Sequence, residues 1–244
     1  LRRILPDKAR AAIFGTLASL YPKADWLPQI FRAKTLFTNI ANDHIFGHFN
    51  SVSLCPPDVK NRVMSMGLKQ ELNGYDSVEV FRKHYANASC RDLLSMVQYV
   101  DFKTYLVDDI LTKVDRASMA NSLEVRVPIL DHKFVELVAQ IPSSLKLQGA
   151  TSKYIFKKAS EHLLPQEILN RNKMGFSVPI GQWLKSDLKP LVHDTLLSKD
   201  FSNRSLFDVK AVRAFWEEHR SGLRNHSDLL WALLSFELWA RRFI

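Results

Sequence analysis

The sequence predicts a mainly α-helical fold. Apolar residues recur at helical spacing through almost all of the 244 residues, and strict apolar–polar alternation longer than four residues is rare. The composition, 46% apolar and 24% charged, is that of a globular chain with a packed core. No two of the eight glycines lie closer than six positions, which excludes a G-x-G-x-x-G turn and a G-x-x-x-x-G-K-[ST] phosphate loop.

The first half of the chain predicts a series of helices separated by prolines. The first begins at Pro6, and the second runs from Ile30 to Phe49 and stops before Pro56-Pro57. The helices predicted after this break span 57–66, 77–87, 93–105 and 108–120.

The second half opens with the one convincingly extended segment, Val125–Pro128, where Pro128 disfavours helix in the residue before it. Asp131 is predicted to cap a helix that ends at Ile141, and Thr151 to cap the next one. The remaining predictions are a loop over 171–179 and two helices over 208–220 and 228–241, joined at Gly222, the second apolar on nearly every face and buried.

The formal charge of +9 is unevenly spread, and residues 145–175 alone carry +4. Its basic residues are Lys146, Lys153, Lys157, Lys158, Arg171 and Lys173, against Glu161 and Glu167. If Thr151 caps a helix, Lys153 falls in its first turn, where backbone N–H groups and the helix dipole attract anions. A solvated helix face is the alternative interpretation of the same run.

Three carboxylates, Asp101, Asp108 and Asp115, repeat every seven residues and would share one face of a continuous helix. Two turns separate neighbours, about 10 Å along the axis, which is too far for one directly shared ion. The sequence therefore predicts no metal site. Helix capping by Asp108 or Asp109, and pairing of Asp115 with a neighbouring arginine, Arg116 or Arg126, are the alternatives.

Glu124 and Arg126 flank the extended segment within an otherwise apolar stretch, Leu123–Leu130. Charges placed in apolar surroundings must be paired to be tolerated. A structural ion-pair network and a wall of an active site both remain open as the reason for them.

The run from Asp115 to Asp131, D-R-A-S-M-A-N-S-L-E-V-R-V-P-I-L-D, resembles the signature of the glutamine-dependent asparagine synthetase family. Further blocks follow in that family's order: Lys153 with Lys157, then Leu164-Pro165, then R-x-K-x-G-F-x-x-P-x-x-x-W from Arg171 to Trp183. The flanks look most like the asparagine-synthetase-like amidotransferases associated with exosortase or exopolysaccharide systems.

The resemblance implies an ATP-pyrophosphatase type α/β synthetase domain that uses ATP and Mg²⁺ to adenylate a carboxylate, of aspartate or a related acceptor. Ammonia, derived from glutamine in an upstream glutaminase domain, then displaces AMP. Lys153 matches the family lysine that contacts the phosphates, and Lys173 is a candidate for closing over substrate. The residues that match site-lining positions are Glu124, Arg126, Asp115 and Arg116.

Several family motifs are not in this sequence: the S-G-G-x-D-S pyrophosphate loop, the G-E-x-x-D-E segment and the N-terminal nucleophilic cysteine. All of them precede the matched region in family order. We therefore expect residues 1–244 to be the helical C-terminal part of the synthetase domain, with the strands of its parallel sheet largely missing. We expect this part alone to be inactive.

Two other functions are kept as alternatives. A basic helical nucleic-acid-binding module is suggested by the charge and the pI of about 9.6, but it is disfavoured because Tyr154, Phe156 and Phe176 are too sparse for a stacking platform. The other is a non-catalytic helical adaptor. The two cysteines, Cys55 and Cys90, form no C-x-x-C motif and fit a cytoplasmic protein. No apolar run suggests a membrane partner, and a homodimer is compatible with the sequence.

Overall fold

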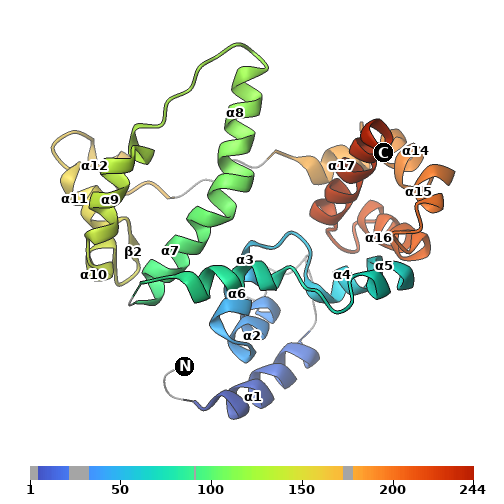
Figure 1. Ribbon diagram of the computed structural model, residues 1–244, viewed down its shortest axis with the longest axis horizontal. Coiled ribbons are helices and arrows are strands. Elements are labelled where there is room, and N and C mark those ends of the chain that lie inside the picture. Colours follow the sequence, from blue (N-terminus) through green and yellow to red (C-terminus); the bar gives the residue numbers. More distant parts are fainter. Residues whose placement is uncertain (1–4, 22–32, 91, 173–177) are drawn as a thin grey trace. The chain divides into compact units, whose positions relative to one another are not determined.

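The computed structural model describes residues 5–21, 33–90, 92–172 and 178–244. Over these ranges the chain is mainly helical, as predicted, and its one sheet has two strands (Figure 1). The chain divides into two compact units: unit 1 comprises Leu1–Glu79 and Ser177–Ile244, and unit 2 comprises Val80–Phe176. No helix in the described ranges is long and apolar enough to cross a membrane.

Unit 1 contains helices from both ends of the chain. They are α1 (Asp7–Leu20), α2 (Lys34–Ala41), α3 (His44–Val52), α4 (Pro57–Val63), α5 (Met66–Glu71), α13 (Ile180–Lys185), α14 (Lys189–Leu196), α15 (Lys199–Asn203), α16 (Val209–Arg220) and α17 (Ser227–Phe243). Helix α6 (Val78–Asn87) begins in unit 1 and continues into unit 2.

The main hydrophobic core lies in unit 1, where α4 packs with α13–α17. Leu184, Val192 and Leu230 are among its fully buried side chains. The two sequence-distant parts are also joined through the backbone: the N–H of Ser65 donates to the carbonyl of Leu206 (3.0 Å), and that of Asp208 to the carbonyl of Val63 (2.8 Å). The C-terminal helices and α4 therefore form one packed body.

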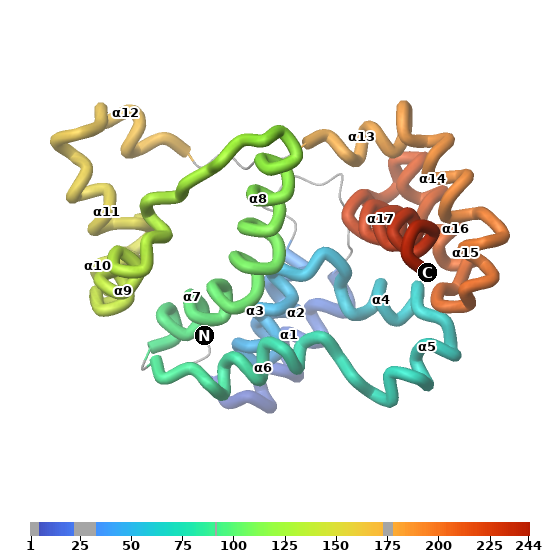
Figure 2. Tube along the Cα trace, turned by 45° about the horizontal axis from the view of Figure 1, so that its top comes forward, coloured from blue at the N-terminus to red at the C-terminus, as the bar shows by residue number. Residues whose placement is uncertain are grey.

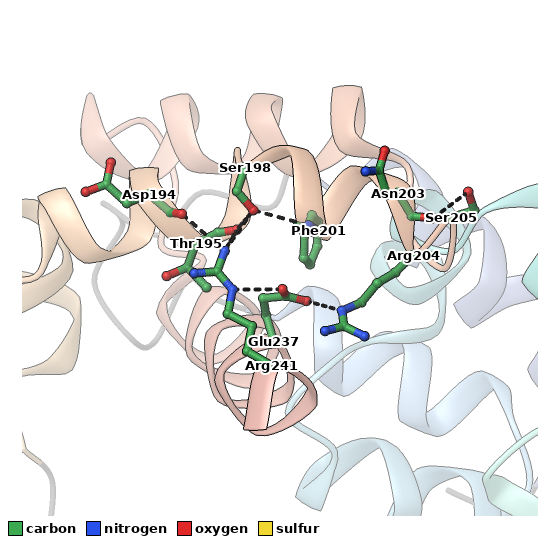
Figure 3. Close-up of polar contacts among 9 residues, drawn as sticks. All are labelled: Asp194, Thr195, Ser198, Phe201, Asn203, Arg204, Ser205, Glu237 and Arg241. Atoms are coloured by element: carbon green, nitrogen blue, oxygen red, sulfur yellow. Dashed lines mark hydrogen bonds and ion pairs between the residues drawn. The ribbon is translucent and has the colours of Figure 1, made fainter. Parts of the chain in front are cut away.

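A buried carboxylate, Glu237 on α17, is held by two arginines (Figure 3). Nε of Arg204 donates to its Oε2 at 2.9 Å, and Nε of Arg241 to its Oε1 at 3.0 Å. Arg241 also donates from Nη2 to Oγ of Ser198 at 2.8 Å. These charge-assisted bonds connect α17 to Ser198, the residue before α15, and to Arg204, the residue after α15.

Two sequence predictions in the first half are wrong in the same way. The predicted helix from Ile30 to Phe49 is interrupted, because Asp43 accepts the N–H of Phe46 (2.7 Å) and caps a new helix, α3; Ile30 itself lies outside the described residues. The helix predicted over 57–66 likewise ends at Val63, because Ser65 caps α5.

The C-terminal helix pair is confirmed, with Asp208 capping α16 and Gly222 in the left-handed region (φ 80°). Helix α17 was expected to be buried on nearly every face, which is only partly right. Its core face carries Leu230 and Leu234, while Trp231 and Trp239 remain 40% and 49% exposed.

Unit 2 contains the remaining elements. They are α7 (Leu93–Lys103), the π-helix η2 (Leu106–Leu111), α8 (Thr112–Met119), the 3-10 helix η3 (Pro128–Leu130), α9 (His132–Gln140), α10 (Ser143–Lys146), β1 (Leu147–Gln148), β2 (Thr151–Ser152), α11 (Tyr154–Ala159) and α12 (Gln166–Leu169).

The π-helix replaces the first part of the α-helix predicted over 108–120. Oγ1 of Thr112 donates to the carbonyl of Val107, five residues back, at 2.9 Å. Asp108 and Asp109 lie inside this wide turn, so the prediction that either one caps a helix is wrong. A π-turn takes in one residue more than an α-turn, which alters the faces on which later residues lie.

Candidate functional site

The candidate site is built around a short hairpin in unit 2. Strand β1 pairs antiparallel with β2, with Leu147 opposite Ser152 and Gln148 opposite Thr151. Gly149 is the first residue of the two-residue connection and has φ 57°, the conformation that glycine supplies in type II′ hairpin turns. The prediction that Thr151 caps a helix is therefore wrong, because Thr151 lies in the second strand.

Lys153 lies at the junction between this hairpin and α11. Its backbone is left-handed (φ 57°, ψ 33°), and its carbonyl accepts the N–H of Lys157 at 2.9 Å. The lysine is thus the N-cap residue of α11 and not, as predicted, part of the first helical turn. A non-glycine residue in this conformation costs about 1–2 kcal/mol, and such strain is concentrated at functional sites.

The Lys153 side chain lines a pocket of about 440 Å³. The other lining residues come from α7, η3, α9 and the residue after it, α10 and α11: Gln98, Ile129, Phe134, Leu137, Val138, Ile141, Lys146, Ile155, Phe156 and Ala159. Figure 2 shows α9, α10 and α11 gathered at one end of unit 2. The pocket is thus mainly apolar, with lysines as its charged groups.

A second pocket of about 370 Å³ adjoins the first, since both are lined by Gln98, Phe134 and Lys146. It extends along α7 to Lys103. The lining residues of the two pockets include three lysines and no aspartate or glutamate. Adjoining apolar pockets lined by lysines and by no carboxylate favour ligands that carry an anionic group.

Lys146 and Gln98 are site residues that sequence reasoning missed. Lys146 is 9% exposed, and its Nζ lies 3.4 Å from Oε1 of Gln98. The sequence placed Lys146 only in a basic window, and no pattern singled out Gln98. Their contact joins α10 to α7 across 48 positions, so no local spacing could have indicated it.

Asp131 connects the signature segment to these pockets. Its Oδ1 accepts the N–H groups of Lys133 (3.0 Å) and Phe134 (3.4 Å), which confirms the predicted cap. The cap fixes the start of α9, the helix that carries Phe134 and Val138 into both pockets.

Asp92 and Ser143 fasten α7 to α10 beside the second pocket. The hydroxyl of Ser143 and the N–H of Ser95 both donate to the Asp92 carboxylate. These bonds, that of Ser143 first, lower the pKa of Asp92 to about 2, because they stabilise its charged form. Ser95 itself lines the pocket.

Glu124 and Arg126 form an ion pair with each other, but the pair is not buried. Their side chains are 70% and 86% exposed, and the apolar neighbours Leu123 and Ile129 are also exposed. The expectation that burial forces this pairing is therefore wrong for the structure of unit 2. A pair so exposed to water contributes little stability.

Asp115 and Arg116 lie on α8, and neither lines the two pockets. The predicted pairing of Asp115 with Arg116 or Arg126 is wrong, since Arg126 contacts Glu124 instead and no ion pair of Asp115 with Arg116 forms in α8. Across the described ranges, no three His, Cys, Asp or Glu side chains come together in a way that could hold a metal ion. Lys173, the remaining candidate, lies outside the described residues.

The family model for asparagine synthase matches residues 12–241. This chain belongs to the asparagine synthase family. It is 38% identical to a putative asparagine synthetase (glutamine-hydrolyzing) of Mycobacterium tuberculosis (strain ATCC 25618 / H37Rv), over 66% of this chain and 24% of that protein. It is 34% identical to asparagine synthetase (glutamine-hydrolyzing) 1 of Bacillus subtilis (strain 168), over 66% of this chain and 25% of that protein.

A third relative is the asparagine synthetase (glutamine-hydrolyzing) of Gallus gallus, 39% identical over 34% of this chain and 15% of that protein. No solved structure matches the chain. The chain thus spans about a quarter of the length of the bacterial relatives it matches.

Proposed function

We propose that this chain is the C-terminal part of the synthetase domain of a glutamine-hydrolysing, asparagine-synthetase-like amidotransferase. Membership of the family over residues 12–241 supports this, as does its match to about a quarter of each bacterial relative. The complete domain would then have the ATP-pyrophosphatase fold, and this chain would supply its helical portion.

The proposed reaction has two steps. A carboxylate oxygen of the acceptor, aspartate or a related acid, attacks the α-phosphorus of ATP, and pyrophosphate leaves. Ammonia derived from glutamine then attacks the acyl carbon, loses a proton and displaces AMP, which leaves an amide. Both steps place negative charge on a leaving phosphate group, so a fixed cation near the phosphates would lower the barrier.

We assign that cation to Lys153. The observation that carries the assignment is the strained left-handed backbone of Lys153, at a position that lines a mainly apolar pocket. Apolar walls lower the local dielectric and so strengthen the interaction between an ammonium group and a phosphate.

The other family-matched residues have supporting roles in this proposal. Glu124, Arg126, Asp115 and Arg116 would line or brace the assembled site, and Lys173 would close over the substrate. Mg²⁺ would accompany ATP, but the described residues offer no cluster of ligands for it. We therefore derive no step through the metal.

The test is a comparison of two lysine variants in the enzyme that contains this chain. Lys153→Ala should lower glutamine-dependent and ammonia-dependent pyrophosphate release alike, by about 100-fold or more, because both reactions pass through the same adenylation. ATP–pyrophosphate exchange measured with aspartate isolates that step and should fall by the same factor.

Lys158→Ala is the matched control. Lys158 lies on the same helix and is exposed, and its Nζ pairs with Glu161 at 2.9 Å. Its removal should change the rate less than about twofold, since an exposed pair contributes little. Near-normal exchange in Lys153→Ala, or an equal loss in both variants, would contradict the role given to Lys153.

A further inference from the structure

A separate pocket of about 340 Å³ lies in unit 1, between the end of α13 and the turn that joins α16 to α17. Its lining residues are Gly181, Gln182, Lys185, His219, Gly222, Arg224 and Asn225. Neither the family signature nor the proposed reaction uses any of them.

The two charged side chains that line this pocket, Lys185 and Arg224, are both positive. Lys185 is half-buried, and no ion pair of its side chain is seen among the described residues. Arg224 reaches Oε2 of Glu218 only at 4.0 Å, and the same oxygen is already 2.7 Å from Nε2 of the buried His226. The carboxylate thus binds mainly to His226, and the two cations are left with incomplete compensation.

His219 is a neutral part of the pocket lining, held in place by two hydrogen bonds. Its Nδ1 accepts the N–H of His226 (3.2 Å), so its Nε2 carries the ring proton and donates to the carbonyl of Gly181 (3.0 Å). Burial lowers the pKa of His219, and the nearby charge of Lys185 lowers it further. The ring therefore adds no positive charge of its own, and its NMR signals can be used to detect binding in the pocket.

Lys185 lies beside a glycine, Gly222, in the turn that joins α16 to α17. Gly222 has φ 80°, a conformation that side-chain-bearing residues rarely adopt, and a Cβ there would lie 4.0 Å from Nζ of Lys185. The ammonium group therefore faces a backbone without a side chain. The amide group of Gln182 adds a further hydrogen-bond donor to the lining.

We propose that this pocket binds a phosphate-type oxyanion, with Lys185 and Arg224 as its charged ligands. The lining offers the hydrogen-bond donors that such an anion needs: two cations and the side-chain amide of Gln182. It includes no carboxylate that would repel the anion. This site goes beyond the proposed reaction and lies in unit 1, whereas Lys153 lies in unit 2.

The experiment titrates the full chain with inorganic phosphate, without ATP and at constant ionic strength maintained with chloride. Binding is followed by the NMR signals of the His219 ring, which lines the pocket. We expect a saturable shift for the unsubstituted chain. Lys185→Gln and Arg224→Gln should each weaken phosphate affinity by about tenfold, the usual effect of losing one charged hydrogen bond.

Lys210→Gln is the control, because it removes one positive charge from an exposed position on α16 of the same unit and does not line the pocket. It should leave the affinity unchanged. A linear, non-saturating shift, or the same loss in Lys210→Gln as in Lys185→Gln, would overturn the site and show only non-specific charge attraction. Circular dichroism of each variant confirms that it remains folded. The measurement does not involve Lys153, so its failure leaves the proposed reaction untouched.

Discussion

Replacement of Glu237 by glutamine tests whether the buried carboxylate stabilises unit 1. The side chain is fully buried and accepts one hydrogen bond from Arg204 and one from Arg241. Glutamine has nearly the same shape, but it loses the charge and turns an N–H₂ group toward one of the two guanidinium groups. The substitution therefore removes the electrostatic interaction without opening a cavity.

The expected loss of stability follows from the exposure of the two arginines that bind Glu237. Removing one member of a buried ion pair costs about 3–5 kcal/mol when both are fully desolvated. The side chains of Arg204 and Arg241 keep 21% and 33% of their exposure, so water replaces part of what they lose. We expect a loss of about 2–4 kcal/mol, which lowers Tm by about 4–16 °C for a unit of this size.

The assay is urea denaturation followed by tryptophan fluorescence, with Glu217→Gln as the control. Glu217 pairs with Arg220 on the surface of α16, where the two side chains are 50% and 48% exposed. Its loss should cost less than about 0.5 kcal/mol. If the two variants shift the midpoint equally, the buried carboxylate does not hold α17 in the way argued from its contacts.

Three further predictions concern single residues. Lys153→Gly should be about 1 kcal/mol more stable to urea than Lys153→Ala, because glycine adopts the left-handed backbone without strain, and equal stability would contradict that strain. Ser143→Ala should raise the pKa of Asp92 from about 2 toward 3.8 in a carbon-detected NMR titration. In the unsubstituted chain, the stability that this carboxylate contributes is present above pH 3.8 and is lost as the pH falls toward 2. The pKa of His219, measured by NMR, should lie below 6.5. The stability of unit 1 should then fall as the pH drops below 6.5, because the ring is protonated there in the unfolded chain before it is protonated in the folded one. A ring that titrates at or above 6.5 would refute this.

The features that the sequence predicted correctly are mostly local. Asp131 and Asp208 cap their helices, and Gly222 takes up a left-handed turn, because each depends on side-chain and backbone groups within a few residues. Apolar periodicity located the helices but not the break at Asp43, since the stripe continues across it. A capping carboxylate there competes with helix continuation, and periodicity does not weigh that competition.

The site was predictable only in part. The resemblance pointed to Lys153, but its left-handed backbone follows the two paired strands before it. Each of these strands has only two residues, which is too short to give a recognisable sequence pattern. The contact of Lys146 with Gln98 depends on packing between distant helices. The exposure of Glu124 and Arg126 also went unforeseen, because an apolar sequence context was taken to mean burial.

The π-helix at Leu106–Leu111 makes the segment that carries the signature unequally tolerant of changes in length. A π-turn holds one residue more than an α-turn, so the loss of one residue here is absorbed by a return to regular helix, and α8 keeps its orientation relative to α7. When a residue is lost from α8 itself, every later residue of that helix turns by about 100° about its axis. We therefore expect a one-residue deletion within Leu106–Leu111 to damage the protein less than a one-residue deletion within Thr112–Met119.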